Sequence, residues 1–110
     1  MKMRPHRRTD LMVNHIVLWN FKPELSAEER KAAGDTIKKN LEAVKTQVEG
    51  IIALSVCINE LNSSNKDIAL ISSFETVDAL NAYQVHPAHV AAAGFVKSVT
   101  CDRVCFDYEA

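Results

Sequence analysis

The sequence predicts an α+β fold in which two helical segments cover one face of a four-stranded antiparallel sheet. Segments rich in β-branched and aromatic residues alternate with segments of helical periodicity, in the order β-α-β-β-α-β. The length of 110 residues is that of one domain, and 47% hydrophobic residues is ordinary for a globular protein. The formal charge of −1 gives no overall reason to expect nucleic acid as a partner.

The first strand is predicted over residues 13–21, a β-rich segment that stops before Pro23. Because side chains alternate along a strand, the segment divides into two faces. One face carries His15, Val17, Trp19 and Phe21, and the other carries Ile16 and Leu18. Large apolar groups on both faces predict a strand that is at least partly buried on each side.

A helix is predicted to begin after Ser26, which forms a capping box with Glu29. Apolar residues then recur at steps of four, four, three and four, as one stripe at helical period. The stripe consists of Ala33, Ile37, Leu41, Val44 and Val48. Gly50 is predicted to end the helix, since glycine readily takes the left-handed conformation just past a helix C-terminus.

Two further strands are predicted over residues 51–59 and 67–74, joined by the short polar turn 60–66. Adjacent strands with such a connection favour an antiparallel hairpin. A second helix is predicted from Thr76 as its N-cap through Val85.

Pro87 interrupts this helix, because the residue before a proline is pushed out of helical geometry. His86 therefore sits at a break, and Pro87 suits the first position of a new helix running to about Lys97. A fourth strand is predicted over residues 100–108.

This order of elements is that of a ferredoxin-like βαββαβ protomer. Two helices cover one face of its sheet, while the other face still carries apolar side chains. A sheet that is apolar on both faces needs a second cover, and a second copy of the chain would supply it. The sequence therefore predicts a homodimer.

The N-terminal segment 1–11 is interpreted as a disordered basic leader to a domain that spans residues 12–110. It contains a single acidic residue, Asp10, and four basic ones: Lys2, Arg4, Arg7 and Arg8. A tail that contacts nucleic acid or a membrane is the alternative, and Met12 is a possible alternative start. The segment lacks the apolar stretch of a secretory signal and no run is long enough to span a bilayer, so we expect no membrane partner and a cytoplasmic location.

The three cysteines, Cys57, Cys101 and Cys105, are interpreted as buried free thiols in a reducing cytoplasm. Their odd number and the lack of a CxxC pair argue against a disulfide framework or a zinc knuckle. On a regular strand, Cys101 and Cys105 would share a face at roughly 13 Å, too far apart to form a disulfide.

The segment from Tyr83 to His89, with sequence YQVHPAH, is the most chemically concentrated part of the chain. It places a phenol and two imidazoles within seven residues. These are the groups that proton-transfer chemistry uses most often. Any functional interpretation has to account for this segment.

The chain resembles the stress-responsive dimeric α/β-barrel family over essentially residues 12–109. The most specific match is His-Pro-x-His with a tyrosine three residues earlier. The segments that carry the resemblance are VNHIVL at 13–18, EGI at 49–51, SFE at 73–75, ALNAY at 79–83, HPAHV at 86–90 and FDYE at 106–109. The resemblance implies two ferredoxin-like protomers packed sheet to sheet as a dimeric α/β barrel. Many members of the family have no assigned activity.

One branch of this family is similar to plant olivetolic acid cyclase, which closes a linear polyketide without a cofactor. That resemblance implies His89 as a general base and Tyr83 as a supporting hydrogen-bond donor, with histidines matching His15 and His86. The chain departs from the cyclase at Ala33-Gly34, where the cyclase has two adjacent phenylalanines. A different pocket wall, and so a different substrate, is expected.

The chemistry needs a base that is neutral near pH 7. As the third residue of a helix, His89 would have its pKa lowered by the positive end of the helix dipole. Tyr83 would then donate to the developing enolate oxygen. Trp19 and Phe21 would supply apolar walls beside His15.

Structural roles for the same residues remain open. Histidines around a proline can cap a helix, Tyr83 can be a core ring, and His15 can be a hydrogen-bonded core residue. Convergence of His15, His86 and His89 on a metal is a further alternative, although no Cys, Asp or Glu stands at ligand spacing. We expect neither a metal nor a cofactor.

Together these inferences predict a stress-related dimeric α/β-barrel protein with a small-molecule pocket. His15, His86 and Trp19 are the predicted ligand-binding residues, and the ligand is expected to be a small apolar or phenolic carbonyl compound. The alternative is a cofactor-independent cyclase or lyase that uses His89 and Tyr83 as catalytic residues. A dimeric scaffold without catalysis is the remaining hypothesis.

Overall fold

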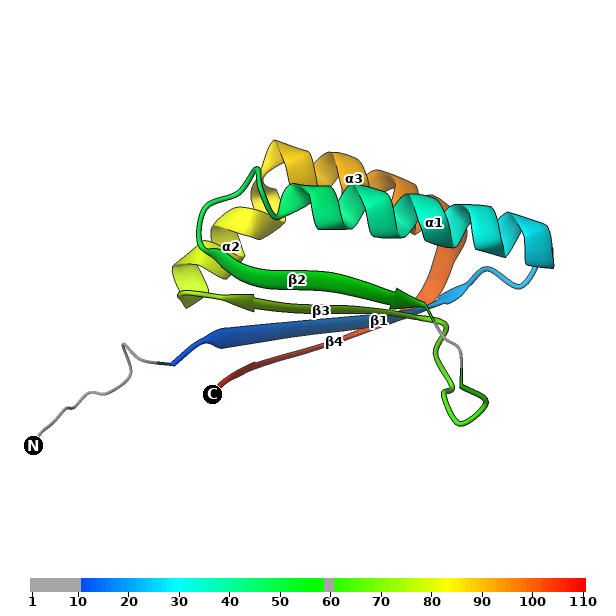
Figure 1. Cartoon of the computed structure of the whole chain (residues 1–110), viewed down its shortest axis with the longest axis horizontal. Coiled ribbons are helices and arrows are strands. Elements are labelled where there is room, and N and C mark those ends of the chain that lie inside the picture. The colour runs from blue at the N-terminus through cyan, green and yellow to red at the C-terminus, as the bar shows by residue number, and fades with distance from the viewer. Residues whose placement is uncertain (1–10, 59–60) are drawn as a thin grey trace, which may run out of the picture.

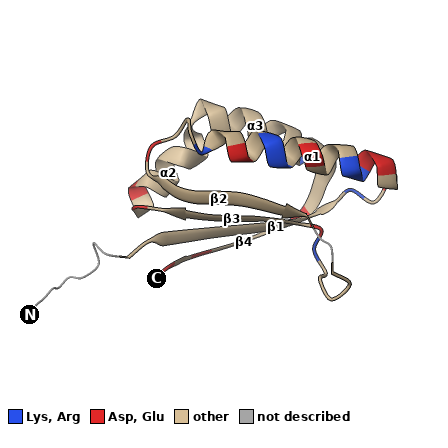
Figure 2. Ribbon diagram, viewed as in Figure 1, with Lys and Arg blue, Asp and Glu red and all other residues tan. Residues whose placement is uncertain are grey.

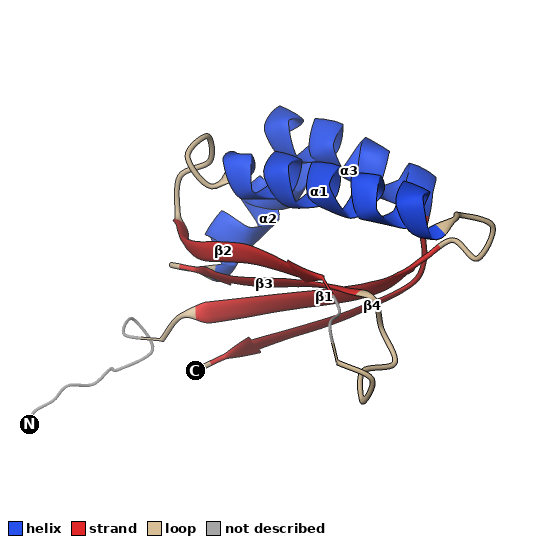
Figure 3. Ribbon diagram, turned by 45° about the vertical axis from the view of Figure 1, so that its right-hand side comes forward, coloured by secondary structure: helices blue, strands red, loops and turns tan. Residues whose placement is uncertain are grey.

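The computed structural model describes residues 11–58 and 61–110, which form two layers. Three helices cover one face of a four-stranded sheet, and the opposite face carries no helix (Figures 1 and 3). The predicted basic leader, apart from Leu11, lies outside the described residues, as does Asn59 at the end of the predicted second strand. None of the described helices is long and apolar enough to cross a membrane.

The element order confirms the predicted βαββαβ protomer, with the second helical segment divided in two. The bounds are β1 Val13–Phe21, α1 Ala27–Val44, β2 Ile51–Ile58, β3 Ile68–Phe74, α2 Val77–Val85, α3 Pro87–Val99 and β4 Thr100–Glu109. The strands lie in the order β2-β3-β1-β4, and each pairs antiparallel with its neighbour. The predicted hairpin between β2 and β3 is therefore confirmed.

The alternation predicted for β1 is confirmed by its burial, because every odd-numbered residue from Val13 to Phe21 is buried. Val17 is fully enclosed and packs in one core with Ile37 of α1 and Phe74 of β3. The even-numbered residues are partly exposed on the face without helices. The central position of β1 thus fixes which side chains point into the space between sheet and helices.

Helix α1 begins with the predicted capping box. The Glu29 backbone N–H donates to Ser26 Oγ at 3.1 Å, and the Ser26 N–H donates to Glu29 Oε1 at 2.8 Å. The buried stripe contains Ala33, Ile37 and Leu41, as the helical period predicted.

The end of α1 differs from the prediction, because the helix stops at Val44 and not near Gly50. The side chains of Thr46 and Gln47 both donate to the Ala43 carbonyl, at 3.2 Å each. They compete for an acceptor that a continuing helix would have used, so the chain turns there. Val48 is still buried, although it lies in the turn that follows the helix.

Gly50 lies directly before β2 and does not cap α1. Its φ of +86° is in the left-handed region that favours glycine. A Cβ at this position would lie 2.6 Å from the Ala79 Cβ, and the Gly50 carbonyl accepts from the Glu75 N–H at 2.9 Å. The glycine therefore permits a close contact between this turn and α2.

The break between α2 and α3 lies where the sequence predicted it. Thr76 caps α2 by accepting the Ala79 N–H at 3.0 Å. His86 has extended backbone angles (φ −66°, ψ 136°), and Pro87 is the first residue of α3. The helix continues to Val99, two residues beyond the predicted end.

An irregularity in β4 overturns the prediction that Cys101 and Cys105 share a face. Cys101 pairs with Asn20 and Cys105 with Val17, with a register shift between these pairs. Asp102 has a φ of +57°, and the extra residue in β4 reverses the alternation. Cys105 therefore faces the helices, whereas Cys101 lies on the opposite face.

The prediction that the three cysteine thiols are buried is also wrong for the single protomer. Cys57 and Cys105 are exposed, and Cys101 is partly exposed. Cys57 pairs with Ala69 on the face without helices, which is open to solvent in one protomer. Cys105 lies on the edge strand, where fewer helical residues cover the sheet.

The face of the sheet opposite the helices is apolar. Ile71 is 48% exposed, and β4 contributes Val104, Phe106 and Tyr108, of which Phe106 is 65% exposed. Charged residues lie along α1, whereas the strands carry few (Figure 2). We call this surface the open face.

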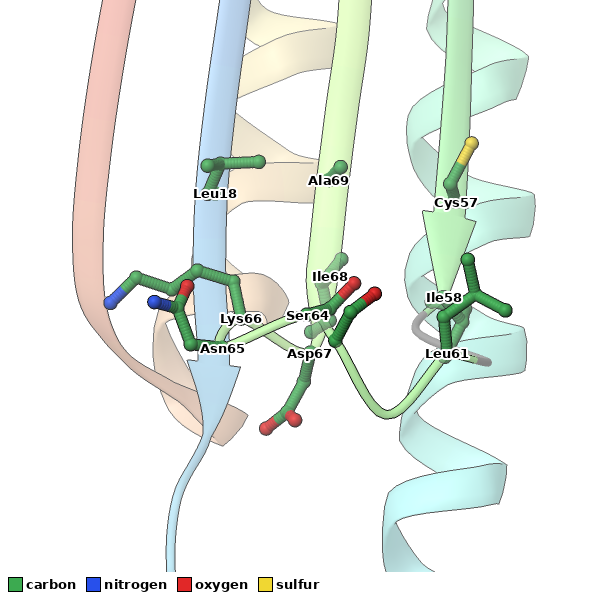
Figure 4. Close-up of a pocket in the computed structure, with 11 residues that line it drawn as sticks. Leu18, Cys57, Ile58, Leu61, Ser64, Asn65, Lys66, Asp67, Ile68 and Ala69 are labelled. Carbon is green, nitrogen blue, oxygen red and sulfur yellow. The ribbon is translucent and has the colours of Figure 1, made fainter.

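A shallow hollow of about 440 Å³ lies at one end of the open face, where the β2–β3 loop meets the sheet. Leu18, Ala69 and Cys57 border it from three adjacent strands, and Lys66 and Asp67 come from the loop (Figure 4). None of the predicted site residues lines it.

Candidate functional site

A cavity of about 560 Å³ lies between α3 and the sheet. Its polar lining includes His15, His89 and Gln84. Its apolar lining consists of Val17, Trp19, Leu41, Leu70, Val90, Ala93, Gly94 and Val96. An apolar cavity with a few converging polar groups is the usual form of a small-molecule site.

His15 is buried on β1 and hydrogen-bonded to the edge strand. Its Nδ1 lies 2.5 Å from Asp107 Oδ1, and the two residues are directly opposed in the β1–β4 register. The His15 ring also packs edge-on against Tyr83, with centroids 6.3 Å apart. The side chain is therefore held in place while it lines the cavity.

His89 is half-buried near the start of α3, with its ring bordering the cavity. Its Nδ1 lies 3.1 Å from the Gln84 carbonyl oxygen. Because a carbonyl only accepts, Nδ1 carries the proton of the neutral ring and Nε2 keeps a free lone pair. Burial lowers the pKa of His89, although the hydrogen bond to Gln84 opposes the shift. The direction agrees with the prediction, but the main cause is burial and not the helix dipole that the prediction invoked.

Tyr83 packs behind these histidines and does not line the cavity. It is fully buried, and its ring lies against His89 with centroids 4.3 Å apart. Its hydroxyl has no hydrogen-bond partner among the described residues. Burial raises the pKa of Tyr83 to about 12, so the phenol stays protonated at neutral pH.

Of the other two predicted ligand-binding residues, one lines the cavity and the other does not. Trp19 lines the cavity from β1 and is buried. His86 does not line it, because its Nδ1 accepts the Ala88 N–H at 3.0 Å and caps α3. Phe21, predicted as an apolar wall, lies toward the other end of the strand.

Two permanent cations line the cavity although the sequence argument did not single them out. Lys97 comes from α3 and Arg103 from β4, and no carboxylate is among the described residues that line the cavity. Their positive charges also lower the pKa of His89, after the effects of burial and of His15. Arg103 points to this face because of the irregularity at Asp102, which no periodicity argument would have detected.

The Ala33-Gly34 pair, where a different pocket wall was expected, does not line the cavity. Both residues are buried in α1. A Cβ added to Gly34 would approach Phe21 Cζ at 3.4 Å and Ile58 Cδ1 at 3.5 Å. This part of the interior is therefore filled by β1 and β2 side chains.

Comparison with known proteins identifies relatives of the chain. The family model for the stress responsive A/B barrel domain matches residues 13–110. No curated protein matches the sequence. The family match covers every element of the described fold.

Solved structures show the same architecture. A dimeric protein of unknown function with a ferredoxin-like fold from Bacteroides fragilis is 32% identical, with a TM-score of 0.85 over 90% of this chain and 96% of that one. A dimeric ferredoxin-like protein from Thermobifida fusca is 20% identical, with a TM-score of 0.74 over 91% and 92%. The hydroxynitrile lyase of Passiflora edulis is 16% identical, also with a TM-score of 0.74, over 90% and 93%. The last two show the fold alone.

Proposed function

The chain belongs to the stress responsive A/B barrel domain family, and from this we propose that it is a homodimer whose cavities bind a small carbonyl or phenolic compound. The observation that carries the proposal is the cavity of about 560 Å³ under α3, lined by Trp19, His15 and His89. Its size is within the range of sites that enclose a small organic molecule.

The open face supports the homodimer. It exposes large apolar side chains of β3 and β4, and such contiguous surfaces usually mark an interface. Two of the solved relatives are described as dimeric proteins. Pairing through the open face leaves the cavity, on the other side of the sheet, accessible in each protomer.

The lining favours a ligand with an apolar body and one electron-rich oxygen group. Val17, Leu41 and Leu70 offer no hydrogen bonds, so they suit a hydrocarbon or aromatic portion. Lys97 and Arg103 favour a carbonyl, phenolate or enolate oxygen, because the described residues that line the cavity include no carboxylate to compete for them. Stress-related function is proposed from the family alone.

The binding proposal is tested by narrowing the cavity. Gly94 lines it, and within the part of the chain that the structure describes an added Cβ would meet no other atom within 4 Å. Gly94→Leu should therefore fold and fill part of the cavity. The matched control is Ala91→Leu, an exposed position on α3 outside the lining. Titration calorimetry with a panel of β-diketones and alkylphenols measures the effect.

We expect the best ligand of the panel to bind wild type and Ala91→Leu equally, and Gly94→Leu at least about tenfold more weakly. Equal binding by all three proteins would show that the ligand lies elsewhere. If no member of the panel binds wild type, the proposed ligand class is wrong.

A second candidate function is cofactor-independent proton transfer by His89. Its Nε2 would take a proton from a carbon between two carbonyl groups, and the electron pair left behind would move to a carbonyl oxygen as an enolate. Arg103 and Lys97 would stabilise that oxygen. Tyr83 would donate to it only if the His89 ring shifts to expose the phenol.

This candidate is tested by deuterium exchange at the central carbon of a β-diketone, followed by NMR in D₂O. His89→Gln keeps a polar side chain without a base and should slow the catalysed exchange by about 10²–10⁴-fold. His86→Asn retains a helix cap and should leave the rate unchanged. Exchange at the uncatalysed rate with wild type, despite measurable binding, would refute catalysis and leave the binding proposal intact.

A further inference from the structure

Three potential metal ligands from two strands converge beside the cavity. His15 Nδ1, Cys105 Sγ and Asp107 Oδ1 all lie within 4.8 Å of one another. The separations are 2.5 Å between His15 and Asp107, 3.7 Å between His15 and Cys105, and 3.5 Å between Cys105 and Asp107. We propose that these residues form a binding site for a zinc-like divalent cation.

The triangle of donor atoms has nearly the size of one face of a tetrahedral zinc site. Zinc bond lengths of about 2.0–2.3 Å place neighbouring ligand atoms about 3.3–3.6 Å apart. The two edges that include Cys105 Sγ are already close to this range. The shorter edge is a hydrogen bond that the ion would replace, and Asp107, with its side chain 41% exposed, has room to move outward.

A cysteine-histidine-aspartate catalytic triad does not fit this arrangement. A triad needs the thiol and the carboxylate on opposite ring nitrogens, whereas both groups here face Nδ1 of His15. Partial burial, followed by the neighbouring Asp107 carboxylate, also raises the pKa of Cys105, which disfavours a free thiolate nucleophile. Convergence on one point is the geometry of a metal site.

The donor set selects among metals. A thiolate, an imidazole and a carboxylate suit zinc, whereas magnesium and calcium prefer oxygen ligands alone. Three protein ligands leave a fourth position for water or a bound compound. Since His15 also lines the cavity, the ion would lie at its edge.

The fold, and not a sequence motif, assembles this site. Asp107 is opposite His15 in the β1–β4 register, and Cys105 is two residues away on the same face of β4. Both β4 residues face the helical side of the sheet, so dimerisation through the open face would leave the site free. We expected no metal from the sequence because no Cys, Asp or Glu stands at ligand spacing from the histidines: His15 is 90 residues from Cys105 and 92 residues from Asp107.

Binding requires the Cys105 thiol to lose its proton, and it requires the His15 proton to move through solvent from Nδ1, where it is hydrogen-bonded to Asp107, to Nε2. The thiol proton leaves to solvent, and the Sγ and Nδ1 lone pairs form bonds to the ion. Affinity should therefore rise with pH until the Cys105 thiol of the metal-free protein is ionised.

The test uses the full-length reduced protein titrated with Co²⁺ and Zn²⁺. We expect a thiolate-to-cobalt charge-transfer band in the near ultraviolet that zinc abolishes, at one ion per chain. Cys105→Ser should lose the band, and Asp107→Asn should weaken zinc binding by at least about tenfold. Cys57→Ser, which removes a thiol on the open face, should behave as wild type.

Several results would overturn the proposal. These are cobalt binding without a thiolate band, a band that persists in Cys105→Ser, loss of the band in Cys57→Ser, or no binding at all. Circular dichroism tests whether each variant is folded. If Cys105→Ser does not fold, retention of the band in both Cys57→Ser and Cys101→Ser still assigns it to Cys105, the third of the three cysteines, and its loss in Cys101→Ser overturns the proposal. The readout is metal binding, so its failure leaves the proposed ligand function unaffected.

Discussion

The Tyr83 hydroxyl is the clearest residue-scale sign that the interior is arranged for more than packing. It is fully buried without a hydrogen-bond partner among the described residues. A buried polar group of this kind costs about 1–3 kcal/mol unless something satisfies it. A bound ligand or water that reaches the phenol would remove that cost.

Tyr83→Phe is therefore predicted to leave the ligand-free protein as stable as wild type or up to about 1 kcal/mol more stable. The ring packing against Phe74 and His89 is kept, and only the unsatisfied hydroxyl is removed. Urea denaturation without ligand measures this difference in the free energy of unfolding. Denaturation with ligand measures whether a bound ligand removes the cost of the buried hydroxyl. A loss of stability without ligand would mean that the hydroxyl has a partner in the folded protein.

His89 should make stability depend on pH. Burial holds its folded pKa below the ordinary value of 6.5, so the unfolded chain binds the proton first as the pH falls. The free energy of unfolding should decrease from about pH 6.5 down to the folded pKa. His89→Gln should make this decrease smaller, measured by urea denaturation between pH 5 and 8. An identical pH dependence in the variant would contradict the lowered pKa.

At the scale of elements, α3 carries much of the site, and His86 fixes where this helix begins. His86→Ala removes the acceptor for the Ala88 N–H and should cost about 1 kcal/mol of stability. His86→Asn keeps a side-chain acceptor that can cap α3, so this variant should retain most of that stability. Thermal denaturation of the pair measures the difference, and equal losses would argue against capping as the role of His86.

The elements also show what the sequence could predict. The Ser26–Glu29 capping box and Pro87 act through neighbours in the chain, so their elements begin where expected. The end of α1 was missed because Thr46 and Gln47 hydrogen-bond back to Ala43. Whether these side chains hydrogen-bond back to Ala43 depends on their geometry, which leaves no periodic pattern in the sequence.

The sequence predicted only part of the candidate site, because the rest depends on the pairing of strands that are distant in sequence. His15 and Trp19 follow from alternation along one strand, and both line the cavity. Arg103, Cys105 and Asp107 depend on the register of β4 and on its irregularity at Asp102. A register across strands distant in sequence cannot be read from local spacing.

At the scale of the whole molecule, we expect two protomers to pair through the open face. Phe106→Lys places a charge at a side chain that is 65% exposed there and should shift the protein from dimer to monomer. Val85→Lys changes a side chain that is 76% exposed on α2 and should remain dimeric. Sedimentation velocity distinguishes the two. Dimerisation of Phe106→Lys with wild-type affinity would place the interface elsewhere.

The cavity under α3 is proposed to bind a small molecule at His89. The most direct measurement is an NMR titration of the histidine side chains, with and without the β-diketone and alkylphenol panel, on wild type and His89→Ala. We expect a pKa for His89 below its ordinary value and ligand-induced shifts in the His15 and His89 signals, with ligand binding weakened in His89→Ala. An ordinary pKa for His89 and no response of either ring to any ligand would contradict it.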